Sequence, residues 1–158
     1  IIVGFNKDYL PADFVEFKYP KGYVDGSVKV GEVLENEVSD RFTISDKLYQ
    51  GHLERKKAHE KKGNGFGFCL FNSDSKYTST ISARYYKDGS EALIEQEGKN
   101  PRMLTPRECA RLQGFPEKFI IPVSNSQAYK QFGNSVCINV IDAVAKSMLD
   151  YLGQYGIL

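Results

Sequence analysis

The spacing of apolar and polar residues changes several times along this chain, and each pattern predicts a different element. Residues 1–5 form a short β-branched run ended by polar residues, which is typical of the last part of a buried strand. Residues 28–34 fit a short helix or a strand equally well. The pattern from Thr43 or Ser45, either of which can cap a helix, predicts a helix to about Lys61 with its leucines facing inward.

A strand pair is predicted in the middle of the chain. Residues 77–86 are rich in Thr, Ile and Tyr, Asp88-Gly89 is a strong hairpin-turn signal, and residues 91–95 can return as the partner strand. Because side chains alternate across a strand, Tyr85 and Tyr86 are predicted to point to opposite faces, with one of them in the core.

Two capping boxes predict helices in the last third of the chain. Thr105-Pro106-Arg107-Glu108 combines the S/T-x-x-E box with a proline at the first helical position, and Gly114 ends that helix. Ser124-Asn125-Ser126-Gln127 starts a second helix, which runs through Phe132 and is closed by Gly133.

A final helix is predicted over about residues 136–152. Its apolar stripe, which needs a partner surface, consists of Val140, Ile141, Val144, Met148 and Leu152. If that surface is missing, we expect the chain to associate with itself through this helix.

Composition narrows the class of protein. The chain is 41% hydrophobic and 26% charged, as in globular proteins, and no apolar run approaches the ~20 residues of a membrane span. Cys69, Cys109 and Cys137 have no metal-ligand spacing, so we expect a reduced, cytoplasmic protein without a metal site. The chain opens with Ile1, not methionine, in the middle of a predicted strand, which indicates a processed or cloned fragment.

Charge is unevenly distributed although the net charge is only +1. Between residues 52 and 62, five basic residues stand against two acids, or about +3. This stretch is either a solvated helix face or a phosphate-binding surface. The loop that follows, Gly63-Asn64-Gly65-Phe66-Gly67, has three glycines, which let its backbone approach another molecule closely.

Two long stretches resemble one family. Residues 102–116, RMLTPRECARLQGFP, are similar to the ninth conserved motif of cytosine-5 DNA methyltransferases, and residues 127–136, QAYKQFGNSV, are similar to the tenth. The opening residues 2–5, IVGF, resemble the end of the eighth motif. The order and spacing of these stretches also match the family.

The region before the ninth motif resembles the variable target-recognition domain of that family. Residues 63–68, GNGFGF, and 80–89, TISARYYKDG, look like those of bacterial enzymes that read short symmetric sites such as CCNGG or GCNGC. Within the second stretch, Thr80-Ile81 matches the threonine–aliphatic dipeptide of such domains.

The resemblance implies an α+β fold: a small, mostly β recognition domain, followed by helices that pack on a Rossmann-like domain dependent on S-adenosylmethionine. Residues 1–17 would end a catalytic-domain strand and its linker, residues 18–100 would form the recognition domain, and residues 101–158 would rejoin the catalytic domain. The intact enzyme would methylate cytosine C5 in duplex DNA, with the base flipped out of the helix.

The motifs that perform this chemistry have no counterpart in these residues. The family's glycine-rich donor motif, its Pro-Cys nucleophile and its Glu-Asn-Val motif are absent. We expect Cys109, in the middle of a capped helix, to be buried and inert, like Cys69 and Cys137. The resemblance gives Arg107, Glu108 and Arg111 a structural role, and we assign no catalytic residue to this chain.

The resemblance also implies two binding groups. Asn134, Ser135 and Val136 would touch S-adenosylmethionine in the intact enzyme, although we do not expect tight binding to this chain alone. Basic and hydrogen-bonding residues would contact double-stranded DNA. These are Arg55, Lys56, Lys61, Lys62, Asn64, Gly65, Thr78, Thr80, Ser82, Arg84 and Lys87.

Three hypotheses follow for a bacterial, cytoplasmic chain of this kind, as in a restriction–modification system. It is a fragment of a single-chain methyltransferase, inactive without its N-terminal catalytic half. It is the natural small subunit of a split enzyme, active with a partner subunit. Alternatively, it is a stand-alone DNA-binding module without catalysis. The start at Ile1 favours the first.

Overall fold

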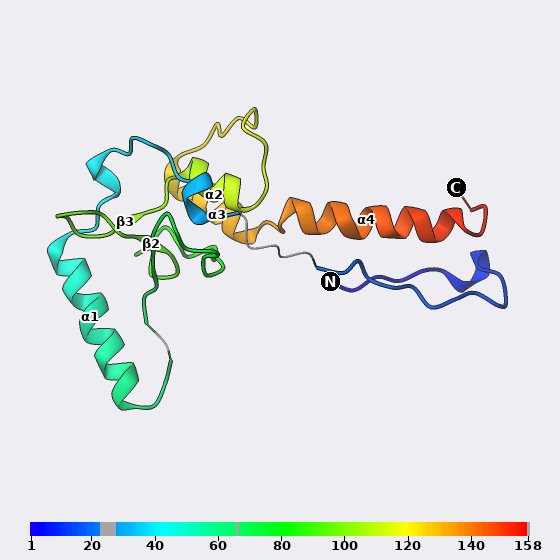
Figure 1. Ribbon diagram of the computed structural model, residues 1–158, viewed down its shortest axis with the longest axis horizontal. Coiled ribbons are helices and arrows are strands. Elements are labelled where there is room, and N and C mark those ends of the chain that lie inside the picture. The colour runs from blue at the N-terminus through cyan, green and yellow to red at the C-terminus, as the bar shows by residue number, and fades with distance from the viewer. Residues whose placement is uncertain (23–27, 66, 158) are drawn as a thin grey trace. The chain divides into compact units, whose positions relative to one another are not determined.

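A computed structural model describes residues 1–22, 28–65 and 67–157 (Figure 1). The chain forms two compact units: Ile1–Val24 together with Ile138–Leu158, and Asp25–Cys137. The residue Phe66, which belongs to the predicted glycine-rich loop, lies outside the described residues.

The first unit is built on aromatic side chains. It contains the 3-10 helix η1 (Lys7–Tyr9) and the helix α4 (Ile138–Gly153). The ring of Tyr151 lies 4.7 Å from that of Phe5 and 5.5 Å from that of Phe17, and its hydroxyl donates to the carbonyl of Val15 at 2.7 Å. In return, the backbone N–H of Val15 donates to the hydroxyl of Tyr155 at 2.8 Å. These contacts hold residues 5–17 along α4.

The predicted strand over residues 1–5 is wrong. The described part of this segment has no strand pairing, and Ile1 and Ile2 are exposed. The reason is that Phe5 packs on the aromatic rings of α4 instead of entering a sheet.

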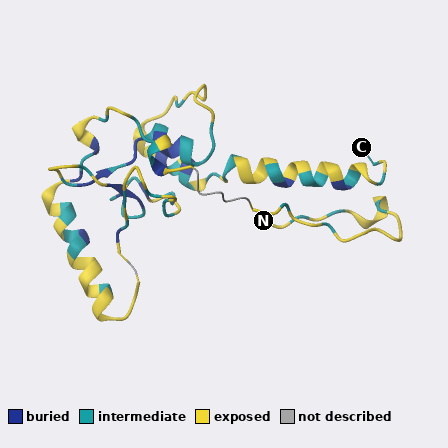
Figure 2. Ribbon diagram, viewed as in Figure 1, coloured by how far each residue is buried: buried dark blue, intermediate teal, exposed yellow. Residues whose placement is uncertain are grey.

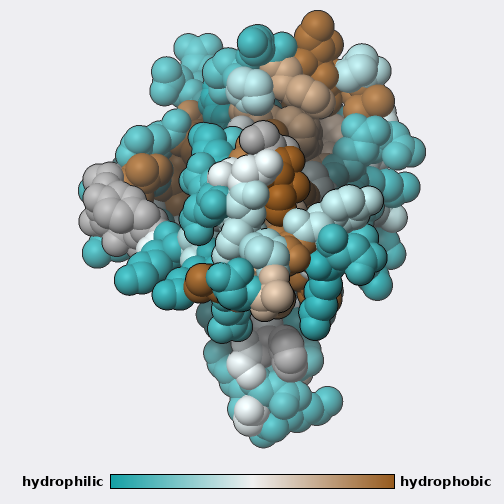
Figure 3. Space-filling view, turned by 90° about the vertical axis from the view of Figure 1, so that its right-hand side faces the viewer, coloured by the Kyte–Doolittle hydropathy of each residue, from teal (hydrophilic) through white to brown (hydrophobic). Residues whose placement is uncertain are grey.

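Helix α4 begins at Ile138, two residues later than predicted. Along its apolar stripe, Val144 is buried, whereas Val140 and Ile141 are 48% and 38% exposed. Figure 3 shows such apolar side chains at the surface among hydrophilic ones.

The second unit begins with two short turns and a long helix. The 3-10 helices are η2 (Val30–Glu32), which decides between the two alternatives for residues 28–34, and η3 (Asp40–Phe42). Helix α1 (Asp46–Lys61) is capped by Ser45, whose hydroxyl accepts from the N–H of Leu48 at 3.3 Å. Its leucines pack on a cluster of Ile44, Phe68 and Leu93, as predicted.

A three-stranded sheet lies beside α1. The strands are β1 (Leu70–Phe71), β2 (Leu93–Ile94) and β3 (Arg102–Met103), in the order β1-β2-β3. β1 and β2 run parallel, with Leu70 opposite Leu93, and β2 and β3 run antiparallel, with Leu93 opposite Met103. Figure 2 shows buried residues on β2 and β3 and on the two helices that follow them in the chain.

The predicted hairpin over residues 77–95 is wrong. Residues 83–88 form successive turns, in which the N–H of Tyr85 donates to Ser82 O at 3.0 Å and that of Gly89 to Tyr85 O at 3.1 Å. β2 lies within the predicted return strand but pairs with β1 and β3. The cause is Tyr85, which is fully buried and hydrogen-bonds through its hydroxyl to Ala92 O and Leu104 N. Tyr86 is half-buried, so the expectation that one of the two tyrosines is core is confirmed.

The α+β class is confirmed, but the recognition region is less β than predicted. Each strand has two residues, whereas α1 has sixteen. Hydrogen bonds between side chains and the backbone, such as those of the Tyr85 hydroxyl with Ala92 O and Leu104 N, connect segments that longer strands would otherwise join. The boundaries at residues 17 and 100 stay predictions.

Both capped helices form. Helix α2 (Pro106–Leu112) carries the predicted capping box, and Gly114 follows it with φ +80°. Helix α3 (Asn125–Asn134) is capped by Ser124. The prediction that Gly133 closes α3 is wrong. The helix continues to Asn134, so Gly133 lies inside it.

Candidate nucleic-acid and cofactor interface

Arg55, on the outer face of α1, is held by two partners. One terminal nitrogen lies 2.8 Å from His52 Nδ1 and 3.2 Å from Asp88 Oδ2. Because a guanidinium only donates, His52 Nδ1 accepts, and its Nε2–H therefore donates to Asp88 O at 3.2 Å. These bonds join the middle of α1 to the turn at residues 83–88.

The surroundings of His52 and Asp88 shift the pKa values of both side chains. Burial is the main cause that lowers the pKa of His52, and the nearby Arg55 guanidinium acts in the same direction. Burial alone would raise the pKa of Asp88, but hydrogen bonds from Ser90 and Arg55 lower it on balance. The arrangement is thus a neutral imidazole between the Arg55 guanidinium and the backbone carbonyl of Asp88.

The remaining basic residues of α1 reach the surface. Lys56 lies over the ring of Phe68, with its Nζ 5.4 Å from the centroid, and a Cβ on Gly67 would lie 3.2 Å from its Cγ. Lys61 and Lys62 are exposed at the end of the helix. Asn64 and Gly65, in the loop that follows, are also exposed.

The turn at residues 82–88 presents two more cations. Arg84 and Lys87 are exposed on it. Ser82 is half-buried, and its hydroxyl donates to Glu91 at 2.5 Å and accepts from the N–H of Arg84 at 3.1 Å. Ser82 therefore shapes the turn, and Glu91 is a partner that sequence reasoning missed.

A cavity of 330 Å³ brings the two predicted binding groups together. It is lined by Thr78, Ser79, Thr80, Ile81, Leu112, Gln113, Ser135 and Cys137. Sequence reasoning placed the threonines in the recognition domain and Ser135 in the catalytic domain. In the structure they belong to one compact unit, and Gln113 is a lining residue that sequence reasoning missed.

The predicted cofactor segment follows α3 directly. Ser135 caps the helix, with its hydroxyl donating to Phe132 O at 2.8 Å, while Asn134 is exposed and Val136 is 60% exposed. An exposed amide, a hydroxyl with a free lone pair and an apolar side chain fit one edge of a cofactor such as S-adenosylmethionine, which has both polar and apolar parts.

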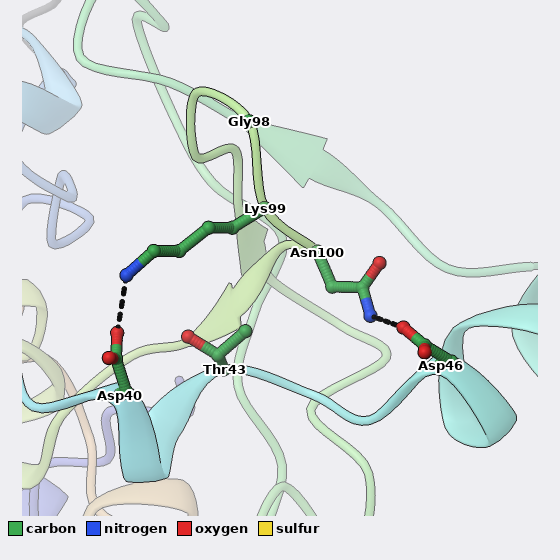
Figure 4. Close-up of a pocket in the computed structure, with 6 residues that line it drawn as sticks. All are labelled: Asp40, Thr43, Asp46, Gly98, Lys99 and Asn100. Carbon is green, nitrogen blue, oxygen red and sulfur yellow. Dashed lines mark hydrogen bonds and ion pairs between the residues drawn. The ribbon is translucent and has the colours of Figure 1, made fainter.

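The largest cavity described, 660 Å³, is a structural junction (Figure 4). Lys99 and Asn100 leave the loop in different directions, Lys99 towards Asp40 and Asn100 towards Asp46, with Thr43 between them. The ammonium of Lys99 lies 2.7 Å from Asp40, and the amide of Asn100 donates to Asp46 at 2.6 Å. Because these polar groups bind one another, they fasten the loop to η3 through Asp40 and to the start of α1 through Asp46.

Cys109 is not available for nucleophilic chemistry. It is fully buried in α2, and burial, together with the Glu108 carboxylate, raises the pKa of its thiol well above the usual range. The expectation of a buried Cys109 is confirmed. Cys69 and Cys137 are only half-buried, so the expectation that they are buried as well is wrong.

Solved structures show the class of fold. The chain is similar to the Schizosaccharomyces pombe Dnmt2 methyltransferase (TM-score 0.65, 18% identity, 80% of this chain and 43% of that one). It is also similar to the Entamoeba histolytica methyltransferase EhMeth (TM-score 0.66, 22% identity, 87% and 46%). The chain therefore shares the fold of part of each of these two proteins.

The family follows from sequence. The family described as C-5 cytosine-specific DNA methylase matches residues 1–150, and the chain belongs to it. The type II methyltransferase M.DsaV of Dactylococcopsis salina is 59% identical over 96% of this chain and 42% of its own length. M1.ScrFI of Lactococcus lactis subsp. cremoris is 57% identical over 96% and 38%. The predicted resemblance to bacterial cytosine-5 DNA methyltransferases is confirmed.

The chain spans about two-fifths of the length of these curated relatives, 42% and 38%. Within the described residues, no helix is both long and apolar enough to cross a membrane.

Proposed function

We propose that this chain selects the DNA site and builds one edge of the S-adenosylmethionine pocket in a cytosine-5 DNA methyltransferase of the restriction–modification type. Residues 18–100 recognise the DNA, and the segment from Asn134 to Val136 faces the cofactor. The observation that carries the proposal is that Thr78, Thr80 and Ser135 line the same cavity. Target recognition and methyl transfer have to meet at one nucleotide, and a shared cavity supports that requirement.

Charge and exposure divide the DNA candidates into two roles. Lys56, Lys61 and Lys62 on α1, together with Arg84 and Lys87 on the turn, are exposed cations that suit phosphate contacts. The neutral groups of Asn64, Gly65, Thr78 and Thr80 suit hydrogen bonds to base edges or the sugar–phosphate backbone.

Arg55 and Ser82 have a third, structural role. Both are engaged within the chain, Arg55 by His52 and Asp88, and Ser82 by Glu91. We propose that they hold the contact surface in shape and do not themselves read DNA.

The cofactor, when bound, supplies the methyl group. This chain's part is to orient it: the amide of Asn134 and the hydroxyl of Ser135 hold polar groups, and Val136 covers an apolar part. Since Cys109 is buried and its thiol is held neutral, we propose that the nucleophile is supplied by residues outside this chain and that the chain alone transfers no methyl group.

The test is a methyl-transfer assay with tritiated S-adenosylmethionine and duplexes that carry CCNGG or GCNGC. The chain is assayed alone and as a chimera, in which it is fused to the part of the D. salina relative that has no counterpart in this chain. Activity of the chimera on one site, with none from the chain alone, supports the proposal. A folded chimera that methylates neither site nor any mixed-sequence DNA rejects it.

The same assay separates the alternatives. Activity on mixing this chain with the remaining part as a separate polypeptide favours the split enzyme with two subunits. Sequence-specific DNA binding by the chain alone, with no activity in either arrangement, favours the stand-alone DNA-binding module.

A further inference from the structure

Helix α3 contacts the turn that carries the DNA candidates at successive positions. The ring of Tyr129 meets the ring of Tyr85 edge-on, with centroids 5.3 Å apart. The ammonium of Lys130 lies 4.9 Å from the ring centroid of Tyr86. Phe132 is buried in the same core cluster as Tyr85. The second half of α3 therefore packs against Tyr85 and Tyr86.

The closest approach is at Gly133. A Cβ on this residue would overlap the carbonyl carbon and oxygen of Ser82 and would lie 2.5 Å from the nitrogen of Ala83. These are backbone atoms, which cannot rotate away as a flexible side chain could. Glycine is required here by the neighbouring backbone, since Gly133 has ordinary helical geometry and alanine is the better helix former.

The end of α3 is also fixed from its other side. The amide of Gln113, which follows α2, donates to Phe132 O at 3.1 Å, and the hydroxyl of Ser135 donates to the same oxygen at 2.8 Å. A displacement at Gly133 would therefore be passed to its neighbours and not absorbed by fraying of the helix. Its neighbours are Ser82 and Ala83 on one side and Asn134 on the other.

We propose that Gly133 is a positioning residue that sets the recognition turn, residues 80–87, against the cofactor segment, residues 134–136, and so couples the two sites. This inference rests on the proposed function of both segments. Because binding free energies are reciprocal, a cofactor that orders the end of α3 alters DNA affinity by the same factor by which DNA alters cofactor affinity. The backbone contact between Gly133 and Ser82 is the physical link.

The test uses the chimera and two glycine variants. Gly133→Ala adds a methyl group against Ser82, whereas Gly51→Ala adds one in α1, where a Cβ would meet nothing within 4 Å. DNA affinity is measured by fluorescence anisotropy with a labelled duplex of the methylated site, with and without S-adenosylhomocysteine, the non-reactive product of the cofactor. Discrimination against a duplex with one altered base pair is measured alongside.

In the unmodified chimera, S-adenosylhomocysteine is expected to change DNA affinity by about fivefold or more, the usual size of coupling between sites. Gly133→Ala should bring this factor close to one and reduce discrimination, while Gly51→Ala should change neither. A Gly133→Ala chimera that keeps both the factor and the discrimination overturns the inference. So does an unmodified chimera that methylates DNA but shows no such factor.

A milder variant decides the matter if Gly133→Ala does not fold. Lys130→Met removes the charge over Tyr86 while keeping most of the side chain, and it should lower the coupling factor with little effect on the melting temperature. An unchanged factor in this variant then overturns the inference. Failure of the proposed function is distinct, since it appears as an unmodified chimera that is folded but methylates no DNA.

Discussion

Glu108 is fully buried and accepts hydrogen bonds from both terminal nitrogens of Arg102, each at 2.8 Å. The same carboxylate accepts from the N–H groups of Thr105 and Glu35, at 2.8 Å each. The Glu108 carboxylate thus accepts hydrogen bonds from three segments: β3, the residue that caps α2, and the segment after η2. Sequence patterning identified it as the second half of a capping box, and the structure adds the ion pair.

Removing one partner of this pair should destabilise the protein strongly, because the other charge stays buried without compensation. We expect Arg102→Met to lower the free energy of unfolding by about 3–5 kcal/mol, measured by denaturant unfolding. Glu117→Gln, which breaks the exposed pair with Arg111, is the control and should have a much smaller effect, because solvent screens an exposed ion pair. Equal effects of the two variants would contradict the assigned role of the buried pair.

Stability should depend on pH through His52. Its pKa lies below the ordinary value of 6.5 in the folded state, so the unfolded chain takes up a proton at a higher pH than the folded chain does. The free energy of unfolding should therefore fall as the pH drops below about 6.5. His52→Gln should flatten this slope in denaturant titrations from pH 7.5 to 5.5. The matched control is His59→Gln, and loss of the slope in the control instead would refute the assignment.

The exposed lysines at the end of α1 should affect DNA binding through charge alone. We expect the double variant Lys61→Ala, Lys62→Ala to weaken binding to all sequences alike and to reduce the slope of log affinity against log salt by up to about two. Lys47→Ala, at the other end of the same helix, should have little effect. A change in sequence preference without a change in the slope would mean that these lysines do not contact phosphate.

Cys109 should be chemically silent. In native protein, a thiol reagent is expected to modify Cys69 and Cys137, which are half-buried, well before Cys109. Cys109→Ala in the chimera should keep methyl transfer and cost about 1–2 kcal/mol of stability from the small cavity. Loss of activity with retained folding would require a catalytic role for this thiol.

Self-association through α4 remains a prediction. Val140 and Ile141 are exposed, and apolar surface of this kind favours association. The chain should elute as a dimer or larger species in size-exclusion chromatography at high concentration, and Val140→Asp with Ile141→Lys should shift it to the monomer. Elution of the unmodified chain as a monomer at every concentration would rule the prediction out.

The helices could be predicted from sequence because their signals are local. Ser45, Thr105 and Ser124 each cap the helix that the pattern assigned to them, since a cap depends on residues within one turn. The strand predicted for residues 77–86 failed because β propensity describes a half-buried pleated surface. It cannot foresee that the hydroxyl of Tyr85 bonds to residues 92 and 104.

The candidate site was predictable only in its parts. Thr80 and Ser135 each stood in a stretch that resembled a family motif, yet they are 55 positions apart, and no local pattern places them on one cavity. The role of Gly133 was misjudged for a related reason. A glycine near the end of a helix usually favours its termination, whereas here the deciding contact comes from a backbone about fifty residues earlier.

The hydroxyl of Tyr85 donates to Ala92 O at 2.6 Å and accepts from Leu104 N at 2.7 Å. One side chain therefore links the residue before β2 to the residue after β3. A few side-chain hydrogen bonds thus hold this part of the chain together, in place of long rows of backbone hydrogen bonds between strands. The stretch of residues 76–80, by contrast, has few hydrogen bonds of its own to lose. A region built in this way can exchange the residues that we propose contact DNA while its framework stays in place.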